Sequence, residues 1–342
     1  MRLAYKFMNK KYILPGLAVL AIAALATIIA ANPQESINKN YEKKLTVVTT
    51  LFPLYDITRS IGGEEADVSL LLDPGMEAHS FEPTPSDMIK INEADVFIYT
   101  GKFMETWAED VLKSVNNKNL LVIDASRNIN LIEDDSEHHD EDGDEHHDED
   151  GDEHHNEDGD GHYHHEGGDP HIWLDFDNLK TMVNNINDGL KEKSPKNWET
   201  FEFRAADYID RISLIDSQYR EGLTNCQQKF IIYSGHFAFN YLAKRYNLNY
   251  LSAYGLSPNS EPSAAVLIAL AKQLKENNAA YIFHEELISP RIAETLERET
   301  GAKPLSLNAA HNLSRRDLDD GKTLFMVFEE NLNNLKLGLN CR

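Results

Sequence analysis

Short apolar runs alternate with amphipathic helical stretches along most of this chain. In the first half, four runs have the composition of β-strands, at 45–50, 67–72, 95–99 and 120–123. Helical patterns lie between or beside them, at 55–61, 86–93 and 104–114. Strands that alternate with helices in this way predict a parallel sheet with helices on both faces.

A long helical pattern separates this first set of elements from a second set. It covers 178–222 and is interrupted near Ser194 and Pro195, and its second piece, 198–219, contains no Gly or Pro. About twenty helical residues extend roughly 30 Å, which is long enough to cross between two domains. The alternation then restarts, with strands expected at 229–233, 249–253, 280–283 and 303–307 and helices at 237–246, 263–277, 290–300 and 322–337.

The pattern as a whole predicts an α/β fold of two lobes, each with a mostly parallel sheet flanked by helices, joined by one long rigid helix. We place the N-terminal lobe at 45–193, the linking helix at 194–224 and the C-terminal lobe at 225–342. Residues 1–44 precede the first strand and form a separate region of the sequence.

The N-terminal 44 residues have the pattern of an export segment. Arg2, Lys6, Lys10 and Lys11 precede an apolar run over 13–31, and a polar spacer follows. A basic flank before an apolar run is typical of a signal peptide, and nineteen apolar residues are also about enough to span a bilayer. A cleaved signal peptide and an N-terminal membrane anchor therefore both remain open. Either one predicts an extracytoplasmic protein, in the periplasm or on the outer face of the cell membrane, exported or anchored by residues 1–31.

A repeat of histidine pairs and acidic residues fills 133–168. The unit HHDEDGDE begins at His138 and again at His146, and two degenerate copies follow. Up to Asp169 the segment holds nine of the fourteen histidines and nineteen of the fifty-seven acidic residues, with no Lys or Arg. Such a composition cannot form a hydrophobic core, so we predict a disordered loop inside the first lobe that collects divalent metal at low affinity.

Charge outside the repeat is nearly balanced. The formal net charge is −24, but the part of the chain outside the repeat has 38 acidic against 33 basic residues. No basic stripe is present to contact phosphates, so a nucleic-acid partner is not expected.

The two cysteines, Cys226 and Cys341, could pair in an exported protein or remain free thiols, and the sequence leaves both open.

Five histidines lie outside the repeat, and four of them share a setting. His79, His236 and His311 each follow a predicted strand, and His171 opens the segment after the repeat. In open α/β sheets ligands bind at the carboxyl ends of the strands. Any one of these residues alone would be an ordinary loop histidine. Four of them, two from each lobe, indicate a metal site in the cleft between the lobes.

The fifth histidine, His284, is followed by Glu285 and therefore resembles the start of a zinc-protease motif. That motif needs a second His four residues on, where this chain has Ile288, and the segment has the pattern of a strand end. We therefore reject a protease. Glu285 is expected to be a hydrogen-bond partner of a ligand or a contact between the lobes.

Several motifs resemble those of the solute-binding proteins of zinc and manganese ABC importers. The carrying segments are HSFEPTP from His79, DPHIWL from Asp169, SGHFAF from Ser234 and SPRIAET from Ser289. With further matches at 49–55 and 94–101, the resemblance covers about 45–340. A histidine-acid loop before Asp-Pro-His is itself typical of the zinc members.

The resemblance implies metal ligands at His79, His171 and His236. Relatives commonly place an acidic fourth ligand in the loop where this chain has His311, so the fourth ligand could be His311, Glu285 or water. Three or four neutral imidazoles suit Zn²⁺ better than Mn²⁺, which prefers carboxylates.

The function expected from the resemblance is capture of Zn²⁺ and its delivery to an ABC permease with its ATPase, by a monomer without enzymatic activity. Three alternatives remain: a manganese or iron component of the same family, a secreted zinc hydrolase, and a metal buffer without a permease. A hydrolase would need an open coordination position and a general base, for which Glu285 is the candidate.

Overall fold

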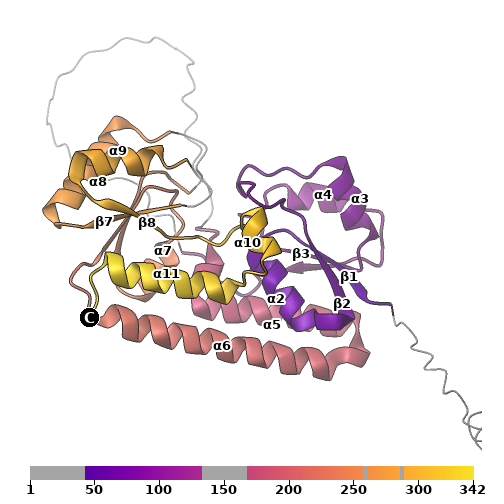
Figure 1. The fold of residues 1–342 in the computed structure, drawn as a ribbon. Coiled ribbons are helices and arrows are strands. Elements are labelled where there is room, and N and C mark those ends of the chain that lie inside the picture. Colours follow the sequence, from indigo (N-terminus) through magenta and orange to yellow (C-terminus); the bar gives the residue numbers. More distant parts are fainter. Residues whose placement is uncertain (1–42, 133–167, 257–260, 286–288) are drawn as a thin grey trace, which may run out of the picture. The chain divides into compact units, whose positions relative to one another are not determined.

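The computed structural model describes residues 43–132, 168–256, 261–285 and 289–342 (Figure 1). The expected leader or anchor and nearly all of the histidine-acid repeat lie outside these residues. Lys44–Arg342 form one compact unit, to which every element below belongs. In the described part of the chain, no helix combines the length and the apolar composition that a membrane span requires.

The first lobe contains a four-stranded sheet in which all strands are parallel. Its spatial order is β2-β1-β3-β4, so the chain starts inside the sheet and the connection from β2 to β3 passes over β1. Val47 of β1 is paired with Val68 on one side and Val96 on the other. The strands are β1 (Leu45–Thr49), β2 (Ala66–Leu70), β3 (Val96–Tyr99) and β4 (Leu121–Asp124).

The second lobe repeats this arrangement. Its sheet has the order β6-β5-β7-β8, again with every strand parallel to its neighbours. The strands are β5 (Phe230–Tyr233), β6 (Asn249–Ser252), β7 (Tyr281–His284) and β8 (Lys303–Ser306). The predicted α/β fold of two lobes with parallel sheets is confirmed.

Helices connect the strands and cover the faces of both sheets (Figure 1). In the first lobe they are α2 (Phe52–Gly62), α3 (Pro85–Glu93), α4 (Ala108–Ser114) and α5 (Phe176–Lys193), with short 3₁₀ turns η2 (Gly63–Glu65) and η3 (Ile172–Leu174). In the second part of the chain they are α7 (Asn240–Arg245), α8 (Ala264–Glu276), α9 (Arg291–Thr300), α10 (Arg315–Asp319) and α11 (Leu324–Gly338).

Two helices begin three or four residues later than the pattern predicts. The expected helix at 104–114 is regular only from Ala108, because Gly101 O accepts the amides of both Met104 and Glu105 in a turn. The expected helix at 237–246 is regular only from Asn240, since Phe237 N donates to Gly255 O instead. In both places, contacts outside the helix bind the backbone that periodicity alone would assign to it. The short helix α10 is not predicted by the pattern.

The long helix α6 (Trp198–Thr224) joins the two lobes. It has 27 residues, about 40 Å at 1.5 Å per residue, and it follows the 3₁₀ turn η4 (Pro195–Asn197). It packs against α2, α5 and α11 along one side of both lobes (Figure 1). One hydrophobic cluster continues through both lobes and includes Val47 and Ile98 as well as Ile231 and Phe283. A shared core of this kind opposes wide hinge opening.

A disulfide links Cys226, just before β5, to Cys341, just after α11. The sequence left this pairing open. Because disulfides persist outside the cytoplasm, the bond agrees with the export expected from the N-terminal pattern.

Candidate metal centre

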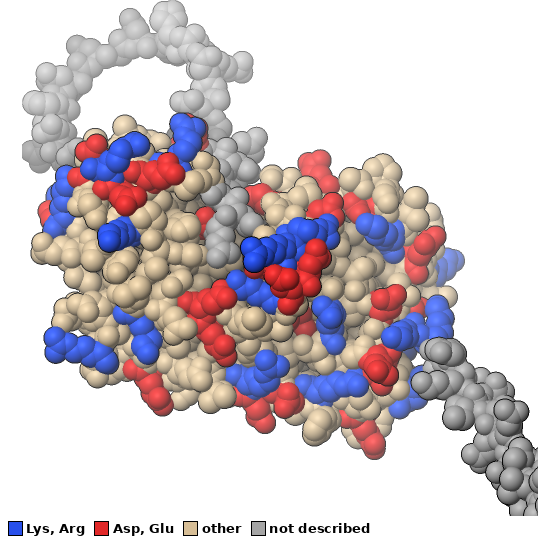
Figure 2. All heavy atoms as spheres, in the orientation of Figure 1, with Lys and Arg blue, Asp and Glu red and all other residues tan. Residues whose placement is uncertain are grey.

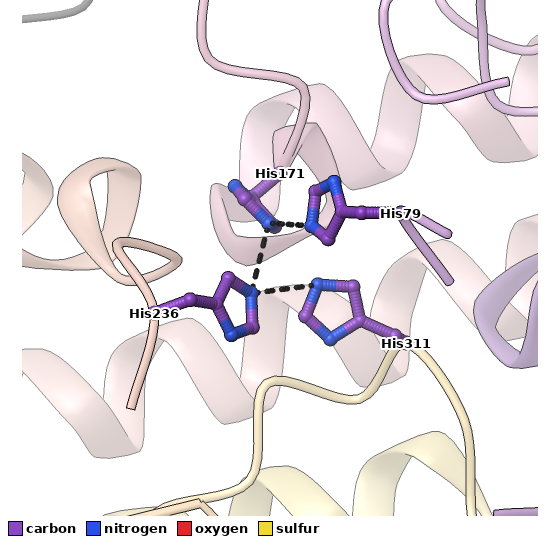
Figure 3. Close-up of side chains that lie close together, drawn as sticks. All are labelled: His79, His171, His236 and His311. Atoms are coloured by element: carbon purple, nitrogen blue, oxygen red, sulfur yellow. Dashed lines mark hydrogen bonds between the residues drawn. The ribbon is translucent and has the colours of Figure 1, made fainter. Parts of the chain in front are cut away.

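Four imidazoles meet between the two lobes. The Nε2 atoms of His79 and His171 lie 3.2 Å apart, those of His171 and His236 3.3 Å apart, and those of His236 and His311 3.2 Å apart (Figure 3). One ligand atom from each of the four residues lies within 4.8 Å of all the others. The residues are thus the four that the sequence analysis singled out.

Each histidine comes from a loop or turn next to a regular element. His79 lies in the loop between β2 and α3, where the Glu77 carboxylate accepts the His79 amide at 3.0 Å. His171 immediately precedes η3, and His236 lies in the turn between β5 and α7. His311 lies in the loop after β8. The loops at the carboxyl ends of the strands therefore supply three of the four imidazoles, as open parallel sheets generally do.

Asp169 sets the protonation of the His171 ring. Its Oδ1 lies 2.7 Å from His171 Nδ1 and also accepts the His171 amide at 3.0 Å, with both side chains fully buried. A carboxylate has no proton to donate, so Nδ1 must carry the proton. His171 Nε2 is therefore left with an unprotonated lone pair that faces the centre of the cluster.

Glu285 does the same for His236. Its Oε2 lies 2.7 Å from His236 Nδ1, and the His236 ring is buried. Gly235 makes this approach possible, because a Cβ at that position would lie 2.6 Å from Glu285 Oε2 and 2.5 Å from the Tyr233 ring. The lone pair of His236 Nε2 thus also faces the cluster.

The facing lone pairs of His171 and His236 repel each other unless a cation lies between them. With Nδ1 protonated on both rings, the contact between His171 Nε2 and His236 Nε2 at 3.3 Å is not a hydrogen bond but a repulsion. Protonation of His171 would relieve it, yet burial and the three neighbouring imidazoles lower the pKa of His171 well below its usual range. Burial, with His236 and His79, lowers the pKa of His311 likewise. A metal ion between the rings would accept both lone pairs.

Three of the six distances between the four nitrogens suit a tetrahedral ion, and all six are at most 4.8 Å. Four nitrogens at 2.0–2.1 Å from a Zn²⁺ ion would lie about 3.3–3.4 Å from one another. The three Nε2 distances of 3.2–3.3 Å are close to this value. The carboxylates on the far side of two rings are the partners that zinc-bound imidazoles commonly have.

Side-chain hydrogen bonds and a ring contact hold the loop that carries His311. Trp173 Nε1 donates to Ala309 O at 2.8 Å, and the Trp173 ring lies 5.2 Å from the His311 ring. Asn308 Oδ1 accepts the amide of Ala310, which adopts a left-handed φ of 61°. A left-handed conformation costs a non-glycine residue about 1 kcal/mol or more, so surrounding contacts must maintain it.

Sequence reasoning placed some of these residues correctly and missed the roles of others. Glu285 contacts His236 from outside the cluster and is not among the four converging side chains. His284, at the end of β7, is likewise outside the cluster. The roles of Asp169 and Trp173 were missed, although both lie in the Asp-Pro-His-Ile-Trp motif that could have indicated them. Asn312, whose Nδ2 donates to Asp73 O and Met76 O, was also missed, and nothing in its local sequence points to it.

Charged side chains of both signs are mixed over the face of the molecule seen in Figure 2. This mixture reflects the near balance of acidic and basic residues in the sequence outside the repeat. The described surface in this view therefore has no large patch of one sign.

Comparison with known proteins relates the chain to zinc-uptake proteins. It is 36% identical over 327 residues to the zinc-binding lipoprotein AdcA of Streptococcus pneumoniae serotype 4, which covers 94% of this chain and 60% of AdcA. It is 36% identical over 321 residues to the high-affinity zinc uptake system protein ZnuA of Bacillus subtilis, covering 93% of this chain and 96% of that protein. The chain thus spans about 60% of the length of the streptococcal relative.

Solved structures give the same picture. The Zn(II)-bound ZnuA-like domain of Streptococcus pneumoniae AdcA matches with a TM-score of 0.70 at 34% identity, over 87% of this chain and all of that domain. The metal-dependent lipoprotein YcdH of Bacillus subtilis matches with a TM-score of 0.70 at 33% identity, over 86% of this chain and all of YcdH.

A family model for ZnuA, described as the periplasmic component A of a zinc-uptake complex, matches residues 47–338. This range includes both sheets, the linking helix and all four converging histidines. The description is that of an uptake component and not of an enzyme. The chain belongs to the ZnuA family.

Proposed function

We propose that this chain is the extracytoplasmic solute-binding component of an ABC importer and that it captures Zn²⁺ between its lobes. His79, His171, His236 and His311 are the proposed ligands. The observation that carries the proposal is the pair of Nε2 lone pairs on His171 and His236, which face each other at 3.3 Å while carboxylates occupy both Nδ1 atoms. Imidazole nitrogens arranged in this way are suited to binding a cation.

The donor set favours zinc over manganese or iron. All four proposed ligand atoms are imidazole nitrogens, which suit Zn²⁺ in a closed tetrahedron, whereas Mn²⁺ prefers carboxylate oxygens. Two relatives are themselves named for zinc binding or zinc uptake. The same donor set argues against a zinc hydrolase, because four nitrogen ligands leave no open position for an activated water.

The functions proposed for the remaining parts of the chain follow from this role. We propose that residues 1–44 export the protein or anchor it in the membrane, and that 45–193, 194–224 and 225–342 act as lobe, linking helix and lobe. The partners are then an ABC permease and its ATPase. The histidine-acid segment 133–168 is proposed as a low-affinity collector beside the cleft, since its many imidazoles and carboxylates can raise the local concentration of metal.

A zinc titration of variants with residues 133–168 deleted tests the proposal. One tight zinc site should survive the deletion and should be lost on His171→Ala or His79→Ala. The four ligands of a structural zinc site together contribute about 10–16 kcal/mol of binding free energy. Removal of each ligand should therefore lower the zinc affinity by a factor on the order of 100. Loss of all tight binding on deletion of 133–168 would show that the cleft is not the site.

A metal series separates the alternatives within the family. The deletion variant should bind Zn²⁺ more tightly than Mn²⁺ or Fe²⁺, because intrinsic affinity and a nitrogen donor set favour the same ion. Preferential Mn²⁺ binding would instead assign the protein to manganese uptake. Co-purification with a membrane permease distinguishes an importer component from a metal buffer.

A further inference from the structure

The loop that carries His311 changes lobes within a few residues. At its start it belongs to the second lobe, where Leu307 N donates to His284 O and Leu307 O accepts from the Tyr233 hydroxyl. From Ala309 onward three of its backbone carbonyls accept hydrogen bonds from the first lobe: Trp173 Nε1 donates to Ala309 O, Phe52 N to His311 O at 3.0 Å and Gly75 N to Leu313 O at 2.9 Å. His311 is therefore attached to the lobe opposite its own strand.

Asn312 makes the most direct of these attachments. Its Nδ2 donates to Asp73 O at 2.7 Å and to Met76 O at 3.0 Å, and its Oδ1 accepts the Leu313 amide at 2.8 Å. The residue is 1% exposed. The turn that it grips lies three residues before His79, and Asn312 itself follows His311. One buried amide thus joins the two segments that present these imidazoles.

The four imidazoles are consequently divided three to one between the lobes. His79 and His171 come from the first lobe, and the loop contacts add His311 to them. His236 belongs to the second lobe, where Glu285 at the end of β7 holds its Nδ1. The sequence alone, which assigns His311 to the strand before it, predicts two imidazoles from each lobe.

We propose that Asn312 is a positioning residue that holds His311 beside His79, so that His79, His171 and His311 form a preassembled three-imidazole half of the site and His236 completes it from the other lobe. The inference rests on the proposed zinc binding. Imidazoles must be held to within about 0.5 Å for productive coordination, and a buried amide with three hydrogen bonds is suited to that task.

Removal of the Asn312 amide is the direct test. In the full chain, Asn312→Ala should weaken Zn²⁺ binding about 10–100-fold, as loss of a partner outside the ligand sphere commonly does. The measurement is competition against a chromophoric zinc chelator, so that low-affinity binding elsewhere does not contribute. Asn312→Leu, which keeps roughly the volume and lacks the amide, provides a second variant if the alanine protein fails to fold.

Asn185 provides a matched control. It is also a buried asparagine of which Nδ2 donates to two backbone carbonyls, those of Ala125 at 3.0 Å and Arg127 at 2.8 Å. It lies on α5 and forms no hydrogen bond with any of the four histidines, all of which belong to the described part of the chain. Asn185→Ala should lower the stability to a similar degree yet leave the zinc affinity within about twofold of the wild type.

A double-mutant cycle separates positioning from general stability. If Asn312 acts through His311, Asn312→Ala should weaken zinc binding little further in a protein that already carries His311→Ala. In a protein that carries His236→Ala, it should weaken zinc binding by the same factor as in the wild type. Equal factors in both backgrounds, or unchanged binding in Asn312→Ala, would overturn the inference. Failure of the wild-type chain itself to compete for zinc would instead overturn the proposed function.

Discussion

The two lobes share one sheet order but join the ends of their strands by different chemistry. In the first lobe the buried Glu105 carboxylate accepts hydrogen bonds from Thr50, Thr100 and Gly101, and so links the ends of β1 and β3. In the second lobe neutral hydroxyls do this work, since Ser234 Oγ donates to Phe283 O and the Tyr233 hydroxyl to Leu307 O. The two sheets have the same strand order, but the strand ends are linked by an ionisable carboxylate in the first lobe and by neutral hydroxyls in the second.

The lobes also differ in how each holds its imidazole. Asp169 is two residues from His171 in the sequence, whereas Glu285 is 49 residues from His236 and reaches it from the next strand of the sheet. A disulfide closes the second lobe, while the chain has no further cysteine with which to close the first. The first lobe thus holds its imidazole through a carboxylate nearby in the sequence, whereas the second uses a carboxylate distant in the sequence and also has a disulfide.

The largest expected effect concerns the covalent closure. Replacing both Cys226 and Cys341 by Ser opens a link across 115 residues and should lower the free energy of unfolding by about 2–4 kcal/mol, measured by chemical denaturation. Amide exchange should rise in β5–β8 more than in β1–β4. Reduction of the wild-type protein serves as the control and should produce the same change. Equal exchange in both sheets would contradict a stabilisation confined to the second lobe.

The two carboxylates that hold imidazoles should differ in their effects on zinc affinity. Asp169→Ala and Glu285→Ala should each weaken binding about 10–100-fold in chelator competition, because each ring loses its orienting partner. Asp169→Ala should be the more severe, since Asp169 is fully buried and accepts the His171 amide at 3.0 Å, whereas Glu285 is 11% exposed and accepts the His236 amide at 3.4 Å.

Asp87, which bonds to Thr84 and Lys90 at the start of α3, is a control carboxylate in the first lobe. Asp87→Ala should leave zinc affinity unchanged. A greater loss from Glu285→Ala than from Asp169→Ala would reverse the expected ranking of the lobes.

A third expected effect is the pH dependence of the stability of the first lobe. Burial raises the pKa of Glu105 to about 7, although hydrogen bonds from Thr50, Thr100 and Gly101 oppose the shift. The folded state therefore binds the proton more tightly than the unfolded state, whose pKa is near 4.5. The contribution to stability is fully present below the unfolded pKa and declines as pH rises to about 7, by about 1 kcal/mol per unit in the middle of this range.

Denaturation of Glu105→Gln between pH 5 and 8 measures this contribution. The difference in unfolding free energy from the wild type should vary with pH, while Glu109→Gln, at an exposed position of the same helical segment, should vary little. A difference that does not change with pH would show that Glu105 stays ionised in the folded protein.

Much of the fold could be predicted from the chain itself. The eight strands follow from short β-rich runs, and the sheets follow from their alternation with helices, because both signals are local. The long helix was predictable since Trp198 to Tyr219 lacks Gly and Pro and keeps a helical pattern. The late start of α7 was not, because its cause is the hydrogen bond from Phe237 to Gly255, a residue distant in sequence.

The candidate site, like the fold, could be predicted from the sequence only in part. The sequence by itself determined which imidazoles were available, since His79, His171, His236 and His311 stand apart from the repeat and adjoin elements at the sheet edges. Tertiary structure alone decided that Glu285 holds His236, that Cys226 bonds to Cys341 and that Asn312 ties His311 to the opposite lobe. These contacts join segments 49 to 239 residues apart. Local patterns carry no information about such pairs, because only the folded backbone brings them within hydrogen-bonding distance.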